Sequence, residues 1–500
     1  MRLPGPTLAA ALTALATLFG ACVAQEPSAP PDTPGTPASA PSPTAWPAPS
    51  PIASGPLTAA DVARLLRSAI CWYDDPSLAA SCLPPSSETV EAIESMGRSG
   101  DPRFVAPLVD MRWLDAGWER WVEDALEAIT GERFDDPRRW YEWQAAGQPR
   151  LPDGYLPWKG HLLSLIDPSY AGLLSGDPAA GLRPDLLLWG GTAVDEVAPL
   201  RDPVFVHRLE ERYLLADDVV FGLVLDGRAR AYPRRIVGWH QLIEDEIGDE
   251  TAAIVFCPPC GGAVAYDPRV DGERYDLGIS GLIYESRSLL FDSQSNSLWD
   301  AFTGRPVLGT LLNREIELQQ RTLVTTTWAD WAARHPNTSV LALDTGHVRD
   351  YSAGAALRGD PQAPAPAFPV RELDGRLPAK EPVLGLLVEG EARAYSVEHV
   401  RAAGIVHDTV GELAVVLLSE GAGAAIGVYR AGGLKVSELT LSSGDLIVIG
   451  DDGGDGTRWF MEEEALVSTV DGRRYAAVSR REGYWFTGSG VHPETTIWGE

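Results

Sequence analysis

Residues 221–232 read FGLVLDGRARAY, and residues 384–395 read LGLLVEGEARAY. Each stretch has an apolar run, then an acidic residue followed by glycine, then a second run, which is typical of two β-strands joined by a tight turn. The two stretches lie 163 residues apart, and Tyr266 and Tyr429 keep the same offset. The sequence therefore predicts two copies of one β-rich domain.

A second repeat marks the ends of the copies, because HPNT at residues 335–338 is echoed by HPET at residues 492–495. Between the copies, residues 354–380 are rich in Pro, Ala and Gly, as linkers are. We place the first domain at 186–355, the linker at 356–380 and the second domain at 381–500. In the first domain we predict strands at 219–225, 229–232, 252–256, 263–266 and 275–279, and helices at 233–243 and 326–334.

Helical patterns come before the β-rich part. A capping box at 58–61 starts the first helix, later helices begin near Ser87 and Asp101, and the last ends at Gly131. We predict an α-helical layer at 58–150 that resembles HEAT-type helical hairpins, and a connecting segment at 151–185. The predicted fold class is α+β and multidomain, with a small all-α, HEAT-like N-terminal layer followed by two related β-rich domains.

The N-terminus has the layout of a bacterial secretory signal. An apolar run at 8–19 leads to Gly20-Ala21-Cys22, which resembles a lipobox, so we predict a lipoprotein signal peptide at 1–22 with Cys22 acylated. Cleavage without acylation is the alternative. Residues 23–57 form a Pro/Ala/Ser-rich linker, with 11 prolines at 27–56, and read as a disordered tether. We therefore expect export and attachment to the outer face of the cell membrane or the cell envelope.

The charge balance limits the partners. With 41 Lys and Arg against 70 Asp and Glu, the net charge is −29, and such a chain repels the phosphate backbone of nucleic acids. Nucleic acid is therefore excluded as a partner. The expected contacts are with the membrane through the lipid anchor and with an envelope protein.

Five cysteines are present. In an exported chain a disulfide between Cys71 and Cys82 is favoured, with two unpaired core cysteines as the alternative. Cys257-Pro-Pro-Cys260 occurs in the first copy alone, because at the shared offset these cysteines fall on Glu420 and Gly423. His240 likewise falls on Ala403. A residue kept in one copy is more informative about function than one that both copies need for the fold.

The ordered motifs around this pair are similar to those of a known family. They are Ala231-Tyr-Pro233, Trp239-His240, Phe256-Cys-Pro-Pro-Cys-Gly-Gly262, Ser280-Gly-Leu-Ile-Tyr284, Ser297-Leu-Trp299, His335-Pro-Asn-Thr338 and Arg349-Asp-Tyr351. Over roughly 186–355 the chain resembles the bacterial and archaeal family called domain of unknown function 3179. The resemblance implies that the cysteine pair is a recurring motif, which carries selenocysteine in some relatives, and it implies no established activity.

Thiol chemistry is the first hypothesis for the site. Two cysteines separated by two residues can close a disulfide ring, with Cys257 as the attacking thiol and Cys260 as the resolving one. Pro258 and Pro259 stiffen the ring, and the glycines at 261–262 let a partner chain approach the sulfurs. His240 would support Cys257 by placing a cation beside its thiolate.

Two other hypotheses stay open. The pair is half of a zinc or copper(I) site if histidines complete it, with His240 as the first candidate and His207, His335 and His347 in the same copy. Otherwise the pair is a structural disulfide in a noncatalytic surface binding or scaffold protein, with no cofactor. The sequence does not decide between an enzyme and a binding protein.

Overall fold

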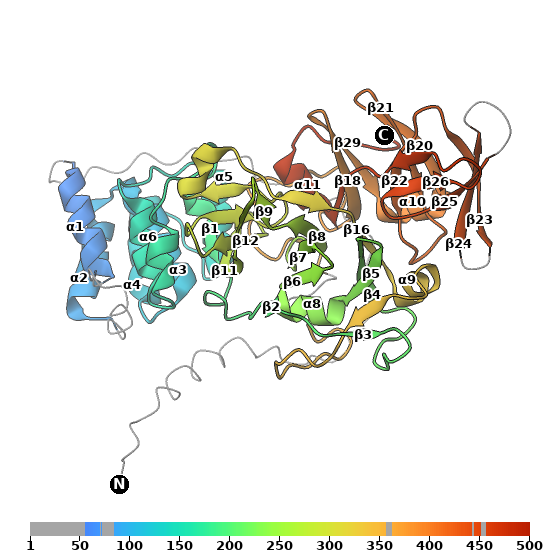
Figure 1. The fold of residues 1–500 in the computed structure, drawn as a ribbon. Helices are drawn as coiled ribbons and strands as arrows, with labels where there is room; N and C mark the ends of the chain where they lie inside the picture. The colour runs from blue at the N-terminus through green and yellow to red at the C-terminus, as the bar shows by residue number, and fades with distance from the viewer. Residues whose placement is uncertain (1–55, 71, 73–84, 357–362, 443–444, 452–456) are drawn as a thin grey trace, which may run out of the picture. The chain divides into compact units, whose positions relative to one another are not determined.

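The computed structural model describes residues 56–70, 72, 85–356, 363–442, 445–451 and 457–500. Helices dominate up to residue 173 and strands dominate after residue 187, so the predicted mixed α+β class is confirmed (Figure 1). Cys22, Cys71 and Cys82 lie outside the described residues, as do the predicted signal peptide and most of the tether. Within the described ranges, no helix has the length and apolar character needed to cross a membrane.

The helical part begins at the predicted capping box. The Thr58 hydroxyl accepts the Asp61 N–H at 3.2 Å, and the Asp61 carboxylate accepts the Thr58 N–H at 3.1 Å. At Gly131 the chain turns left-handed with φ of 77°, which ends a helix as predicted. Helices also occupy the segment 151–185. The seven helices described here are α1 (Ala59–Ala69), α2 (Ser87–Ser99), α3 (Val105–Leu114), α4 (Glu119–Thr130), α5 (Pro137–Ala146), α6 (Tyr155–Leu163) and α7 (Ser169–Leu173).

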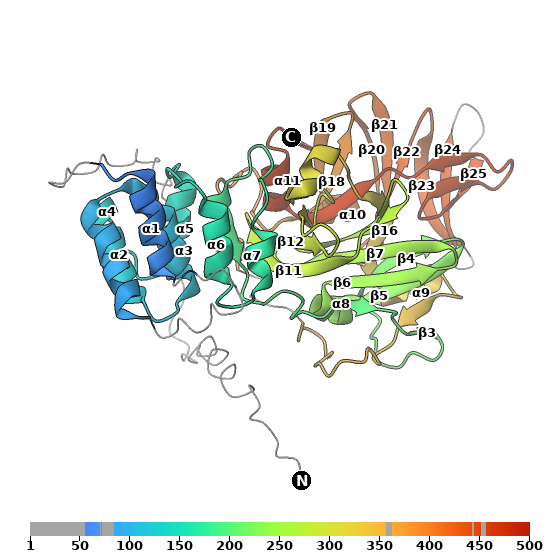
Figure 2. The same cartoon turned by 60° about the vertical axis from the view of Figure 1, so that its left-hand side comes forward.

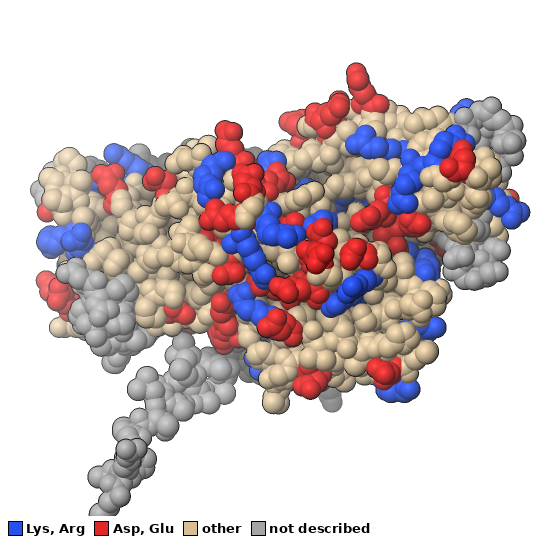
Figure 3. Space-filling view, viewed as in Figure 1, with Lys and Arg blue, Asp and Glu red and all other residues tan. Residues whose placement is uncertain are grey.

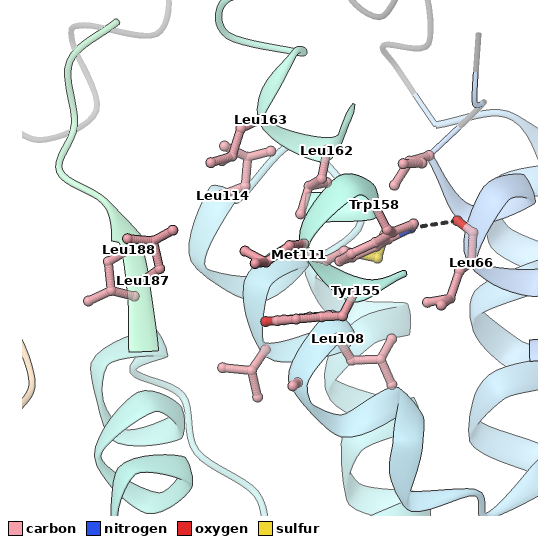
Figure 4. Close-up of a cluster of buried hydrophobic side chains, with 14 of the residues drawn as sticks. Leu66, Leu108, Met111, Leu114, Tyr155, Trp158, Leu162, Leu163, Leu187 and Leu188 are labelled. Atoms are coloured by element: carbon pink, nitrogen blue, oxygen red, sulfur yellow. Dashed lines mark hydrogen bonds between the residues drawn. The ribbon is translucent and has the colours of Figure 1, made fainter. Parts of the chain in front are cut away.

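The helices pack around one apolar core, part of which is drawn in Figure 4. Met111, Tyr155 and Trp158 are almost fully buried there, and the Trp158 indole N–H donates to the Leu66 carbonyl oxygen at 2.8 Å. The same cluster includes Leu187 and Leu188 from the first strand of the β-rich part. The helical layer and that sheet therefore share one core.

The β-rich part contains two sheets with the same strand order at different places in the chain. In the first half, residues 186–355, the order is β16 (Leu323–Thr327), β4 (Val219–Leu225), β5 (Arg228–Pro233) and β17 (Ser339–Leu341), with β3 (Phe205–His207) added at the edge. In the second half, residues 381–500, it is β28 (Arg480–Tyr484), β18 (Pro382–Val388), β19 (Glu391–Ser396) and β29 (Thr496–Ile497).

A second pair of sheets is related in the same way. The first half has β15 (Gln319–Arg321), β8 (Gly262–Asp267), β7 (Glu250–Cys257), β6 (Leu242–Ile247) and β2 (Leu200–Arg201), in this order, and the second half has β22 (Gly427–Arg430), β21 (Leu413–Leu418) and β20 (Ile405–Val410). The helices correspond too, with α8 (Arg234–His240) matching α10 (Val397–Ala403), and α9 (Trp328–Arg334) matching α11 (Trp485–Val491).

The halves differ in what they insert between the matching elements. The first half inserts the short pair β9 (Arg269–Val270) and β10 (Glu273–Arg274). It also inserts β11 (Leu277–Tyr284), β12 (Arg287–Asp292), β13 (Leu298–Asp300) and β14 (Pro306–Leu308), which form a sheet with the earlier strand β1 (Leu187–Trp189). The second half inserts a meander of β23 (Lys435–Ser442), β24 (Asp445–Asp451), β25 (Thr457–Met461), β26 (Ala465–Ser468) and β27 (Arg474–Ala476). Figure 2 labels its first three strands.

The predicted helix at 233–243 is wrong at its C-terminal end. The helix α8 stops at His240 because Gln241 adopts a left-handed φ of 57°. The Gln241 carbonyl then accepts the Phe256 N–H at 2.7 Å, and β6 starts at Leu242. Pairing with β7, a contact distant in sequence, ends the helix.

Candidate functional site at the cysteine hairpin

Cys257 and Cys260 lie in the turn of a β-hairpin. Cys257 is the last residue of β7, and it pairs in antiparallel register with Gly262, the first residue of β8. The N–H groups of Cys260 and Gly261 both donate to the Cys257 carbonyl at 3.0 Å, and Gly261 has the left-handed φ of 75° that this turn requires. A disulfide joins the two cysteines. The ring is therefore held by the backbone as well as by the sulfurs.

The Cys257 sulfur accepts two backbone hydrogen bonds. One comes from the N–H of Cys260 at 3.3 Å, and the other from the N–H of Ser288 on β12 at 3.4 Å. Donors aimed at a sulfur stabilise negative charge on it. The neighbouring Arg287 does not add a free cation, because its guanidinium is ion-paired with Asp300 at 2.8 Å.

Both cysteines are buried in the core of the first half, and the second half of the chain covers the backbone of their hairpin. Cys257 is 3% exposed and Cys260 is 0% exposed. The N–H of Tyr484, at the end of β28, donates to the Cys260 carbonyl at 2.7 Å. A methyl group on Gly262 would overlap the carbonyl oxygen of Glu482. The sequence predicted that a separate partner chain would approach these glycines. The approaching chain is instead the second half of the same molecule.

This cover is reciprocal between the two halves. The N–H of Thr327, at the end of β16, donates to the Gly423 carbonyl at 3.0 Å. Thr327 corresponds to Tyr484, as β16 corresponds to β28, and Gly423 corresponds to Cys260 at the offset of 163. Each half therefore covers the equivalent hairpin of the other, as in an isologous interface. Of the two hairpins, the first carries the cysteines.

His240 makes its described contacts away from the sulfurs. Its Nδ1 lies 2.8 Å from the Ala198 carbonyl oxygen, and its Nε2 lies 2.6 Å from the Tyr351 hydroxyl. Burial lowers the pKa of His240, which favours the neutral ring. Within the described part of the chain it has no hydrogen bond to either cysteine. We predicted that a His240 cation would support a Cys257 thiolate, but the described hydrogen bonds of His240 go to Ala198 and Tyr351.

The other candidate metal ligands are dispersed. His207 is on β3, His335 lies 3.0 Å from the Glu463 carboxylate, and the His347 ring is 5.2 Å from that of His240. Among the residues that the structure describes, no three His, Cys, Asp or Glu side chains are grouped so that they could hold a metal ion. These residues do not assemble a site around the cysteine pair.

A cavity of about 950 Å³ adjoins the hairpin. One wall is the hairpin itself, with Phe256, Pro258 and Pro259, and a second wall comes from the bulged strand β11 and from Ser288. Further lining comes from residues 325–327, from the segment 365–368 and, in the second half, from residues 482–484. This cavity could not be predicted from the sequence, because its walls come from segments far apart in the chain.

Comparison with known proteins identifies a family for most of the β-rich part. A family model described as "Protein of unknown function (DUF3179)" matches residues 194–495. The chain belongs to this family. The match runs through both halves and so extends beyond the residues 186–355 on which the resemblance was first seen. No curated protein and no solved structure matches the chain.

Proposed function

We propose that this DUF3179 protein binds a small molecule in the cavity beside the cysteine hairpin. The observation that carries the proposal is the cavity itself, at about 950 Å³, which falls within the size range of small-molecule sites. Apolar side chains such as Phe256, Ile279 and Leu282 line the cavity, together with the hydroxyl-bearing residues Ser288 and Thr325. This combination is typical of ligand sites.

The burial of the sulfurs favours a small ligand over a protein substrate. Exchange with a protein thiol requires a sulfur that the attacking group can reach in line. Here Cys260 is fully buried and Cys257 nearly so, and the backbone of 482–484 lies over the hairpin. In this proposal the disulfide has a structural role, because it fixes the wall that Pro258 and Pro259 present to the ligand.

The experiment is a fluorescence titration of the full chain with 1-anilinonaphthalene-8-sulfonate. We expect saturable binding with one probe per chain. Val397→Trp, at the start of α10 where Val397 lines the cavity, should weaken binding at least tenfold. Val470→Trp is the matched control, since Val470 is 81% exposed and lies outside the cavity. Non-saturable binding, or equal binding by the two variants, would contradict the proposal.

A second candidate function is thiol–disulfide exchange with a small thiol, which the two N–H donors to the Cys257 sulfur favour. A thiolate of the small thiol attacks the Cys257 sulfur, and Cys260 leaves as a thiolate and takes a proton. A second small thiol then attacks the mixed disulfide, and Cys257 leaves as the thiolate that the N–H groups of Cys260 and Ser288 stabilise. The net change oxidises two thiols to one disulfide and reduces the cysteine pair.

Glutathione is the probe for this second function. We expect Cys260→Ser to accumulate a mixed disulfide between glutathione and Cys257, seen by peptide mass mapping, and the wild-type pair to equilibrate with a glutathione buffer. If Cys257 and Cys260 stay oxidised at every ratio of reduced to oxidised glutathione, the exchange function is wrong. That result would not affect the proposal of small-molecule binding.

We also propose that the protein is exported and anchored through Cys22, and that Cys71 and Cys82 are bridged. The lipobox-like Gly20-Ala21-Cys22 and the proline-rich tether support the first part. Mass mapping of the protein from its native cells should find a lipid-modified Cys22 as the first residue and a Cys71–Cys82 disulfide. A chain that still begins at Met1, or begins at an unmodified Cys22, would refute the anchor.

We propose further that the two halves are related domains and that the helical layer is HEAT-like. The equal strand order of the sheets β16-β4-β5-β17 and β28-β18-β19-β29 supports the first part. An experimental structure in which the matching strands and helices of the two halves failed to superpose would contradict it.

A further inference from the structure

The cavity concentrates positive charge in an acidic protein. The chain has a net charge of −29, and on the face drawn in Figure 3 acidic and basic side chains lie interspersed over the β-rich part. The cavity lining has the opposite balance. Its charged residues are the cations Arg138, Arg234, Lys380 and Arg401 and the single carboxylate Glu482. A pocket lined by one sign of charge concentrates ligands of the opposite sign.

Arg234 is the cation best placed to meet a ligand. The adjacent Arg235 is ion-paired with Asp218, whereas no hydrogen bond or ion pair joins Arg234 to another residue in the ranges that the structure describes. Arg234 is exposed and lines the cavity, and partial burial lowers the pKa of its guanidinium. The Asp218 carboxylate acts on Arg234 only through its charge, since it is ion-paired with Arg235, so the Arg234 guanidinium can gain direct hydrogen bonds from an incoming anion.

Two of the other cations are already engaged. Arg138 is paired with Glu142 at 2.7 Å and also donates to the carbonyls of Pro366 and Ala367. Arg401 donates to the Ala424 carbonyl through Nε at 3.1 Å, which leaves its terminal nitrogens for a second contact. Arg234 is therefore the primary anchor, and Arg401 adds long-range attraction.

The cations around Tyr484 indicate where the anion would bind. The Lys380 ammonium lies 5.8 Å from the centre of the Tyr484 ring, and Arg234 is near enough to affect the pKa of that tyrosine. Tyr484 itself packs on Gly261 and donates its N–H to Cys260. Lys380 therefore places positive charge in the part of the cavity that adjoins the cysteine hairpin, and Pro258, Ile279 and Leu282 add apolar lining.

We infer that the cavity takes an organic anion, with its acidic group on Arg234 and its apolar body against the hairpin and β11. This inference rests on the proposed function and specifies its ligand class. A carboxylate, phosphate or sulfonate satisfies the chemistry equally, because each offers oxygen acceptors to a guanidinium.

The test compares two probes that differ in one acidic group. 1-Anilinonaphthalene-8-sulfonate and N-phenyl-1-naphthylamine share the same aromatic body, and only the first carries a sulfonate. We expect the full-length wild-type protein to bind the anionic probe at least tenfold more tightly than the neutral one. Arg234→Gln should remove most of this preference, and Arg234→Lys should keep part of it.

Arg228→Gln is the matched control, because Arg228 is exposed at the turn between β4 and β5 and does not line the cavity. It should behave as wild type. Suppose that both probes bind with equal affinity and that Val397→Trp abolishes the binding of both. The proposed function is then supported, and the inference about the anion is wrong. If neither probe binds saturably, the proposed function falls with it. A preference that Arg234→Gln leaves intact would overturn the role of Arg234.

Discussion

The N–H of Tyr484 donates a 2.7 Å hydrogen bond to the carbonyl of Cys260, so the second half of the chain covers the cysteine hairpin of the first. The equivalent bond from Thr327 to Gly423 measures 3.0 Å. Because the cover is reciprocal, loss of packing at the cysteine hairpin should weaken the contact between the halves as well as the hairpin.

Gly262→Ala should destabilise the protein. The new methyl group would overlap the Glu482 carbonyl oxygen, and backbone atoms cannot move aside without shifting β28. Overpacking of this kind costs about 1–3 kcal/mol of unfolding free energy. Urea denaturation measures the change, and Gly433→Ala is the control, since a methyl group there meets no atom within 4 Å. Equal stability of the two variants would show that β28 does not pack on the hairpin in solution.

Replacing both Cys257 and Cys260 by serine should lower the unfolding free energy by about 2 kcal/mol, because the disulfide closes only a short loop. The pair lies in a turn whose backbone hydrogen bonds remain, so the fold should persist. Probe binding in the cavity should weaken, since Pro258 and Pro259 are then held less firmly. Unchanged affinity in the folded double variant would remove the structural role proposed for the disulfide.

Glu463 should make the protein sensitive to acid. Its side chain is buried, yet the His335 hydrogen bond and the Arg334 charge outweigh burial and lower its pKa from 4.5 to about 2. A lowered pKa stabilises the folded state above pH 4.5, and this contribution is lost as the pH falls from 4.5 to 2. The shift corresponds to about 3 kcal/mol.

The measurement for Glu463 is unfolding free energy against pH. The loss of unfolding free energy in Glu463→Gln should be largest near pH 6. Between pH 4.5 and 2 the unfolding free energy of this variant should change less with pH than that of the wild type. Glu462→Gln is the matched control, because Glu462 is exposed. If the Glu463 variant kept the wild-type slope, the ion pair between α9 and the second half would not form in solution.

Lys159→Met should be strongly destabilising in the helical layer. The Lys159 ammonium lies 2.8 Å from the Asp110 carboxylate, and both side chains are at most 3% exposed. Removing one partner leaves a buried carboxylate and typically costs 3–5 kcal/mol. The further change Asp110→Asn should recover part of the loss in thermal unfolding. A double variant no more stable than the single one would contradict this explanation.

The sequence predicted those features that local chemistry determines. The strand at Val219–Leu225 is confirmed, because its apolar run ends at the Asp226-Gly227 turn. The capping box at Thr58 is likewise visible in four consecutive residues. The end of α8 was mispredicted because Gln241 takes its conformation from a contact with Phe256.

Features built from distant residues escaped prediction for the same reason. Gly261 and Gly262 were recognised as points of close approach, but the approaching residues Glu482–Tyr484 lie more than 200 positions later. Ser288 carries no motif that marks it, because its role depends on a backbone N–H.

The most direct test of the account is a crystal structure of the full chain with 1-anilinonaphthalene-8-sulfonate. We predict probe density in the cavity beside the hairpin, with the sulfonate within hydrogen-bond distance of the Arg234 guanidinium and the rings against Pro258 and Pro259. Density confined to the molecular surface, with the cavity empty of probe, would contradict the proposal that this cavity is the ligand site.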